Sequence, residues 1–186
     1  MIRYLAQNQN WAKVTPLLGV IATITLFKYT NINEPIFWAL VNIPMYLFHQ
    51  MEEHFLPGGF KNYVNQKMNQ GIEKLNDVKV FWINIIVVWF TFIIFGILSC
   101  LNIAFGFAII IFSVINCLAH IIMAIKQKEW NPGLCMATVQ FILSIYAAWF
   151  ISINGNIAHL LLWWIGMIAF SIITHIVIFK VSMTRN

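Results

Sequence analysis

Two histidines and two glutamates lie close together in the stretch FHQMEEHFLPGGF, residues 48–60. On a helix, His49 and Glu53 would be one turn apart, and Glu52 would lie about 60° to the other side of His49. Ionisable groups are costly inside an apolar helix, so we expect these three side chains to face the interior of a helical bundle. Imidazole nitrogens and carboxylate oxygens on one face can bind a metal ion or exchange protons.

Other apolar runs carry polar side chains at a depth similar to that of His49. At a rise of 1.5 Å per residue, this depth is about 7–15 Å below one membrane boundary. Asn42 and Tyr46 continue the face of His49 on its own helix. Because polar groups without partners are costly in hydrocarbon, we expect all of these residues to meet in one site. The residues from the other runs are Asn84, Asn116, His120 and His175.

A metal-dependent hydrolase is the first chemistry that these residues favour. His49, Glu53 and His120 would be the ligands of a divalent metal ion, with His175 as a fourth ligand and Glu52 as the general base. Zinc is favoured by the mixture of nitrogen and carboxylate ligands, and iron is the alternative. Asn84, Asn116, Asn42 and Tyr46 would support the ligands or orient the substrate.

Two other functions remain open. In the first, no metal binds, and Glu52 and Glu53 act with His49 and His120 as acids and bases, as in a protease or an isomerase. In the second, the chain is a small-molecule transporter or binding protein with a proton-coupled His/Glu site. A transporter favours polar groups near the bilayer midplane and an internal repeat, and the sequence suggests neither.

The elements that would position these residues are transmembrane helices. The chain is 61% hydrophobic and 9% charged, whereas a soluble domain is about 25% charged. Its apolar runs are close to the ~20 residues that a spanning helix needs. We predict an all-α, polytopic membrane bundle of six transmembrane helices in one domain, residues 1–186, with no cleaved signal peptide. The predicted spans are about 14–30, 35–55, 80–99, 103–125, 134–153 and 158–180.

The basic residues predict the orientation of this bundle. If all six runs span, every Lys and Arg except Lys28 falls on one side, which the positive-inside rule assigns to the cytoplasm together with both termini. The net charge of +5 therefore follows the topology and does not indicate nucleic-acid binding. The residues on the predicted cytoplasmic side are Arg3, Lys13, Lys61, Lys67, Lys74, Lys79, Lys126, Lys128, Lys180 and Arg185.

The connection after the second run predicts an additional helix. Pro57, Gly58 and Gly59 would end the second span. Apolar residues then recur at steps of three and four through residues 60–75, with lysines between them. We predict an amphipathic helix in the cytoplasmic headgroup layer, as an anchor or as a lid over the site. His54 points about 140° away from His49, so we predict that it is interfacial and not a partner.

The same residues resemble the HXXEE-motif family of bacterial membrane proteins. The resemblance covers the chain from the second run to the start of the fifth. Trp130 stands where the family has Tyr, which leaves the turn intact but puts any role of a tyrosine hydroxyl in doubt. The matching residues are His49, Glu52 and Glu53 for H-x-x-E-E, His120 for the later histidine, and Pro132 and Gly133 for the Y-x-P-G turn.

The resemblance implies a site at these residues and a role as an integral-membrane peptidase. A looser similarity, to CAAX-processing intramembrane proteases, rests on the Glu-Glu pair and lacks the arginine that follows the pair there. We therefore expect a hydrolase that acts on a membrane peptide or lipid at the cytoplasmic leaflet. It would be a multi-pass protein of the bacterial cytoplasmic (inner) membrane, with bilayer lipids and the substrate as its partners.

Overall fold

A computed structural model describes residues 2–184, and in this range all regular structure is helical with no strand. Arg185, part of the predicted charge pattern, lies outside the described residues. Five described helical segments are long and apolar enough to cross a membrane. They are Ile2–Tyr29 (α1 Ile2–Ala6, η1 Gln7–Val14, α2 Thr15–Tyr29), Asp77–Leu101 (α6 Asp77–Trp82, η2 Ile83–Trp89, α7 Phe90–Leu101), Ile103–Gln127 (η3 Ile103–Phe105, α8 Gly106–Gln127), Leu134–Asn154 (α9) and Leu160–Met183 (α10).

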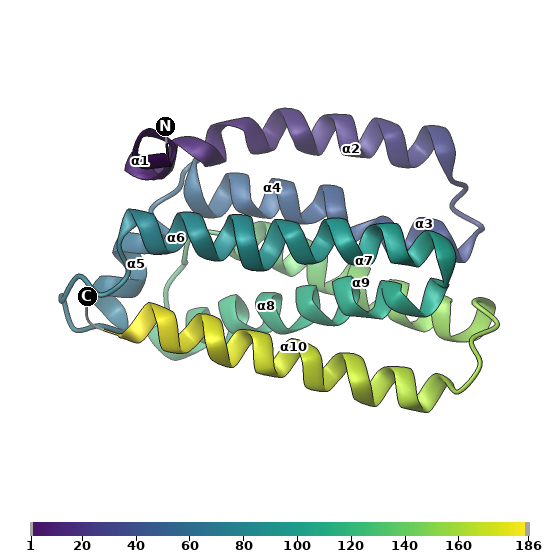
Figure 1. Ribbon diagram of the computed structural model, residues 1–186. Helices are drawn as coiled ribbons and strands as arrows, with labels where there is room; N and C mark the ends of the chain where they lie inside the picture. The colour runs from purple at the N-terminus through teal and green to yellow at the C-terminus, as the bar shows by residue number, and fades with distance from the viewer. Residues whose placement is uncertain (1, 185–186) are drawn as a thin grey trace.

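The predicted second span is divided into two shorter helices, α3 (Pro35–Leu40) and α4 (Asn42–His54). Pro44 has no N–H group to donate to the carbonyl of Leu40, so the helical hydrogen-bond ladder is interrupted here. Val41, between the two helices, keeps helical backbone angles, and the two helices follow one another along the bundle (Figure 1). Six continuous spans are therefore not confirmed among the described residues, because this segment contains no helix of spanning length.

Both chain ends lie at the same end of the bundle (Figure 1). We call this end, where α1, α5 (Phe60–Lys67) and the last turns of α4, α8 and α10 also lie, the terminal end. The six membrane crossings predicted from the sequence would require both ends of the chain to lie on one side. The assignment of the terminal end to the cytoplasm stays a prediction.

The helix predicted for residues 60–75 ends at Lys67. Gln70 and Gly71 have positive φ angles of 55° and 80°, which stop the helix. The Asn65 side chain then holds the loop, because its amide donates to the Leu75 carbonyl (2.7 Å) and its oxygen accepts from the Leu75 N–H (3.0 Å). The predicted amphipathic helix is therefore only its first half, and the rest is a folded loop.

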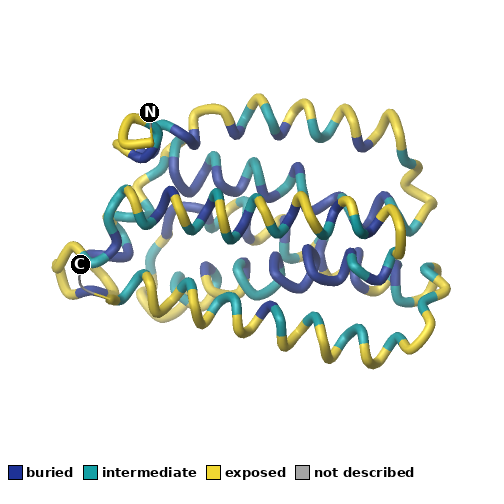
Figure 2. The backbone as a smooth tube through the Cα atoms, in the orientation of Figure 1, coloured by how far each residue is buried: buried dark blue, intermediate teal, exposed yellow. Residues whose placement is uncertain are grey.

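Helix α8 forms the centre of the bundle and packs against α9, α10 and α4. Its side chains Phe107, Ile109, Ile110 and Phe112 are fully buried. Figure 2 shows buried backbone concentrated on α4 and α8, while α2 and α10 are largely exposed. Apolar side chains that remain exposed on these outer helices suit contact with lipid. The core therefore places the last turns of α4 and α8 beside the start of α9.

Candidate functional site

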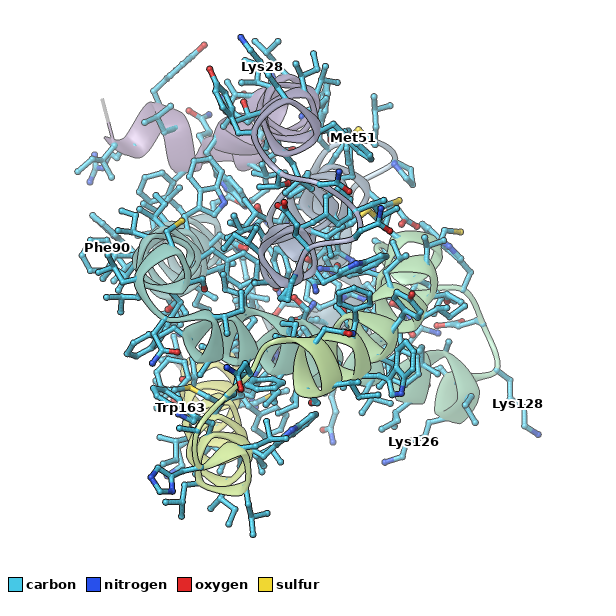
Figure 3. All side chains as sticks on the ribbon, turned by 90° about the vertical axis from the view of Figure 1, so that its right-hand side faces the viewer. Lys28, Met51, Phe90, Lys126, Lys128 and Trp163 are labelled. Carbon is cyan, nitrogen blue, oxygen red and sulfur yellow. The ribbon has the colours of Figure 1, made fainter. Side chains whose placement is uncertain are left out.

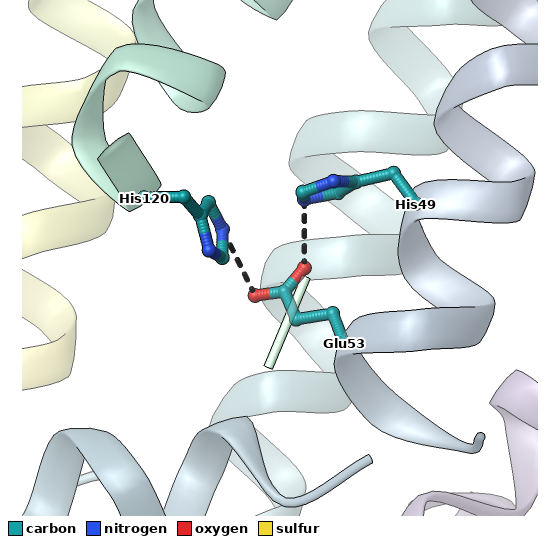
Figure 4. Close-up of side chains that lie close together, drawn as sticks. All are labelled: His49, Glu53 and His120. Atoms are coloured by element: carbon teal, nitrogen blue, oxygen red, sulfur yellow. Dashed lines mark ion pairs between the residues drawn. The ribbon is translucent and has the colours of Figure 1, made fainter. Parts of the chain in front are cut away.

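Glu53 lies between two histidines from different helices at the terminal end. Its carboxylate oxygens are 3.4 Å from His49 Nε2 and 3.9 Å from His120 Nε2. Figure 4 shows the two imidazoles on either side of the carboxylate. All three residues are buried, and one ligand atom from each lies within 4.8 Å of the others. The structure thus brings together three of the four predicted metal ligands from positions up to 71 residues apart.

Asn131 fixes the orientation of His120, and the sequence did not identify it. Its amide nitrogen donates to the His120 carbonyl (2.9 Å), so its oxygen is the atom that faces His120 Nδ1 at 2.8 Å. Nδ1 must therefore carry the proton, and Nε2 of the neutral ring keeps its lone pair. The Nε2 lone pair of His120 and the Glu53 carboxylate therefore adjoin the same space. Both are electron-pair donors, so a cation between them would have two ligands.

Replacing Asn131 by alanine is expected to weaken metal binding by about 10–100-fold, because His120 would lose the group that fixes its tautomer and orientation. Asn131→Asp keeps an oxygen acceptor for Nδ1 and is expected to retain most of the affinity. Zinc titration of purified protein monitored by calorimetry checks both values. Equal affinity of the wild type and Asn131→Ala would contradict the orienting role.

Gly133 allows both histidines to approach the start of α9. Its φ angle is +96°, in the left-handed region that favours glycine. A β-carbon at this position would lie 2.9 Å from His120 Cε1, closer than real contacts of this kind, and 3.2 Å from His49 Cε1, a tight contact that would require a small shift. The predicted turn at Pro132 and Gly133 therefore leaves room for the two imidazoles beside the start of α9.

Gly133→Ala is expected to displace His120 and to lower zinc affinity and stability together. Gly71→Ala is a matched control, because Gly71 also has a positive φ (+80°) but has no neighbour within 4 Å of a built β-carbon. Both variants carry similar backbone strain, so the difference between their zinc affinities isolates the steric effect. Calorimetry and thermal unfolding measure both quantities, and equal affinities would show that the close approach is unimportant.

Glu52 is held by the first turn of α9. Its two carboxylate oxygens accept hydrogen bonds from the backbone N–H groups of Cys135 (3.1 Å) and Met136 (2.6 Å). These N–H groups belong to the first turn of α9, where helices have no internal acceptors and carry partial positive charge. The geometry therefore favours a role in capping α9 over the general-base role predicted for Glu52.

His54 is buried against the site and contacts Glu53, contrary to the prediction that it is not a partner. Its Nε2 lies 3.4 Å from a Glu53 oxygen, and Trp11 of the N-terminal segment covers its ring at a centroid distance of 5.1 Å. The helical wheel was misleading for two reasons. The flexible Glu53 side chain reaches across to its neighbour, and the position of Trp11 cannot be read from helix spacing.

A chain of hydrogen bonds orients His54. Indole is only a donor, so the bond from Trp89 (2.7 Å) identifies the Gln50 oxygen as the acceptor. The Gln50 amide nitrogen then donates to the Asn84 oxygen (2.8 Å), which leaves the Asn84 nitrogen facing His54 Nε2 at 3.3 Å. His54 Nε2 therefore accepts the Asn84 N–H, and this nitrogen lies 3.4 Å from a Glu53 oxygen. Asn84 and Trp89 both belong to the widened π-helical turn η2, a feature often found at functional sites.

The remaining predicted residues divide into neighbours of the site and separate elements. The Asn116 amide nitrogen lies 3.1 Å from His49 Nε2, and the Tyr46 ring packs on His49 at 5.4 Å. In contrast, Asn42 accepts hydrogen bonds from Gln140 (3.1 Å) and Ser144 (2.8 Å) in a network that links α4 to α9.

His175, predicted as the fourth ligand, does not join the group of His49, Glu53 and His120. Its Nδ1 donates to the Ser171 carbonyl within α10 (2.8 Å), and its ring packs on Phe112.

Comparison with known families identifies the motif to which these residues belong. A family model described as "Protein of unknown function with HXXEE motif" matches residues 40–150, more than half of the chain, and the chain therefore belongs to this family. The match contains α4, η2, α8 and the start of α9, which supply the site. No curated protein and no solved structure matched the chain significantly.

Proposed function

We propose that this member of the HXXEE-motif family is a membrane-embedded, metal-dependent hydrolase in which His49, Glu53 and His120 bind one divalent metal ion. The observation that carries the proposal is the buried group of two imidazole nitrogens and one carboxylate oxygen within 4.8 Å of one another. Buried ionisable groups in a membrane bundle are costly and are typical of functional sites.

The residues present fit such an ion. Catalytic zinc sites commonly use three protein ligands and keep a further position open for water or substrate. Asn131 directs the lone pair of His120 toward the space beside Glu53, as expected of a residue that supports a metal ligand. We favour zinc over iron because hydrolysis needs a Lewis acid and no redox change. A bound ion would supply this Lewis acidity to water or to the substrate carbonyl.

We assign the proton transfers to His54. Its Nε2 lies 3.4 Å from a Glu53 oxygen, and Asn84 and Trp11 hold the ring in place. An attacking water molecule in this space could lose its proton to His54 Nε2 if it replaced the hydrogen bond that this atom accepts from Asn84. Glu52 would contribute indirectly, since it anchors the start of α9 close to His120.

We place the site in the bacterial cytoplasmic membrane, on its cytoplasmic side. The proposal rests on the lysine-rich α5 region at the terminal end and on the positive-inside rule. A substrate would then be a peptide or lipid that reaches the site from the cytoplasmic leaflet.

A metal-free acid–base enzyme is a second candidate, and a specific observation favours it. Glu53 lies within 3.9 Å of three imidazole nitrogens, those of His49, His54 and His120. A proton held by Glu53 could be shared with any of these rings, which would suit an isomerase or a protease without metal.

Metal removal separates the two candidates. Wild-type protein in proteoliposomes would be assayed with fluorogenic lipid esters and fluorogenic hydrophobic peptides, before and after removal of metal by a chelator and after addition of zinc. We expect turnover of one class, its loss on chelation and its return with zinc. His49→Ala is expected to stay inactive throughout. Turnover that survives complete metal removal would favour the acid–base enzyme. No turnover of either class would contradict the metal-dependent hydrolase and a metal-free protease.

A further inference from the structure

An apolar groove runs along α4 and leads toward the site. It is a cavity of about 440 Å³, lined by α2 on one side, by η2 and α7 on the other, and by α4 as its floor. Figure 3, which looks along the bundle, shows α2 (Lys28) and α7 (Phe90) on two sides of α4 (Met51). Its wall is formed by apolar side chains such as Leu18, Ala22, Ile43, Leu47, Phe92 and Ile93. Its size is that of a site for a small ligand.

The length of the groove matches one membrane-lipid chain. On α2 its lining extends from Leu18 to Tyr29, which corresponds to about 17 Å at 1.5 Å per residue. The hydrocarbon core of a bilayer is about 30 Å thick, so the chains of one leaflet extend about 15 Å. Ile21, which lines the groove, is also 50% exposed, so the groove lies at a surface that faces lipid.

One end of the groove adjoins the group of His49, Glu53 and His120. Tyr46, Gln50 and Trp89 line it there, and Tyr46 also packs on His49. Along α4, Glu53 and His54 lie three and four residues beyond Gln50, so the face of the groove continues directly to them. The Trp89 indole donates a hydrogen bond to the Gln50 oxygen (2.7 Å), and the Gln50 nitrogen donates to the Asn84 oxygen (2.8 Å), which orients His54. The groove and the site therefore share a wall.

The chemistry of the lining selects against a peptide in extended conformation. Such a peptide would bring unpaired backbone N–H and C=O groups into an apolar channel, at a cost of several kcal/mol for each group. In the wall, the Gln50 amide is already committed to Trp89 and Asn84, and the Thr30 hydroxyl donates to the Leu26 carbonyl. A hydrocarbon chain needs no such partners and gains from burial.

We infer that this groove binds one acyl chain of a lipid, so that the polar linkage of the lipid lies beside Glu53. The inference rests on the proposed function for the step that follows binding, and it specifies a lipid with at least one fatty-acyl chain as the substrate class. Chain binding itself needs only the groove and neither metal nor turnover.

Binding of cis-parinaric acid, a fluorescent polyene fatty acid, tests the groove directly. Energy transfer from tryptophan is expected to saturate with wild-type protein in detergent. Saturated fatty acids are expected to compete best at one chain length and less well when shorter or longer. Ala22→Trp fills the groove and is expected to weaken binding at least tenfold. Ile24→Trp places the same side chain on α2 outside the lining and is expected to have no effect.

Several outcomes would overturn the inference. These are equal binding by wild type and Ala22→Trp, competition that simply rises with chain length as in bulk partitioning, and displacement of the probe by a hydrophobic peptide but not by fatty acids. The two proposals fail separately. Saturable chain binding without turnover would retain the groove and reject the hydrolase. Lipid turnover that Ala22→Trp leaves unchanged, in rate and in chain-length preference, would retain the hydrolase and reject the groove.

Discussion

Replacing Glu53 by glutamine is expected to lower turnover by at least about a hundredfold while the fold is retained. The amide has the same shape and volume, so the packing at the end of α4 should change little. It carries no negative charge, however, so the proposed metal ion would lose its only anionic ligand in the group of His49, Glu53 and His120. Initial rates in proteoliposomes and thermal unfolding in detergent measure the two effects.

Glu73→Gln provides the matched control for this substitution. The Glu73 side chain is 66% exposed, and its carboxylate lies 3.8 Å from the Lys61 ammonium group and contacts none of the site histidines. An exposed ion pair of this kind contributes little to stability. We expect wild-type rates and unfolding for this variant. Full activity of Glu53→Gln would exclude Glu53 from the chemistry.

Replacing Glu52 by alanine is expected to destabilise the protein by about 1–3 kcal/mol, because two partly buried N–H groups at the start of α9 would lose their acceptor. Loss of the carboxylate also removes its favourable interaction with the helix dipole. A clear decrease in the melting temperature should accompany a partial loss of activity, because α9 positions Gly133 next to both histidines. Thermal unfolding with a parallel rate measurement checks the prediction.

Glu52→Gln refines the comparison, since its single amide oxygen can still accept a hydrogen bond from the first turn of α9. We expect stability between that of the wild type and that of Glu52→Ala, with activity restored in proportion. A Glu52→Ala protein that is as stable as the wild type but completely inactive would instead support Glu52 as the general base.

The membrane class and the central group of the site could be predicted from the sequence. Apolar runs of spanning length identify lipid-facing helices without reference to tertiary structure, and the exposed apolar faces of α2 and α10 agree with this. Polar side chains in those runs must face inward. His49, Glu53 and His120 were expected to meet for this reason, and their ligand atoms lie within 4.8 Å.

The roles within the site depend on features that helix spacing does not encode. The rotation of α4 against α9 decides that Glu52 meets the Cys135 and Met136 N–H groups while Glu53 meets the histidines. Asn131 lies in the connection before α9, where no periodic pattern indicates its direction. Asn42 found hydrogen-bond partners in Gln140 and Ser144 instead of in the site. A similar depth in the membrane could not predict which of the two groups of polar residues Asn42 would join.

The interrupted second span shows the same limit for the fold. Pro44 signals a disturbance of the helix, and the disturbance separates α3 from α4 at Val41. The apolar spacing of residues 60–75 continues beyond Lys67, but the positive φ angles of Gln70 and Gly71 and the side chain of Asn65 fold that part into a loop. Local backbone and side-chain bonds outweigh a weak amphipathic pattern there.

The metal content of the purified protein, measured by elemental mass spectrometry without chelators in the preparation, tests the central claim most directly. We predict about one zinc per chain in the wild type. The metal should be lost in His49→Ala, Glu53→Ala and His120→Ala, and retained in His175→Ala, which removes a histidine that does not join the group. Wild-type protein without stoichiometric metal, or metal that all four variants retain, would contradict a metal site at His49, Glu53 and His120.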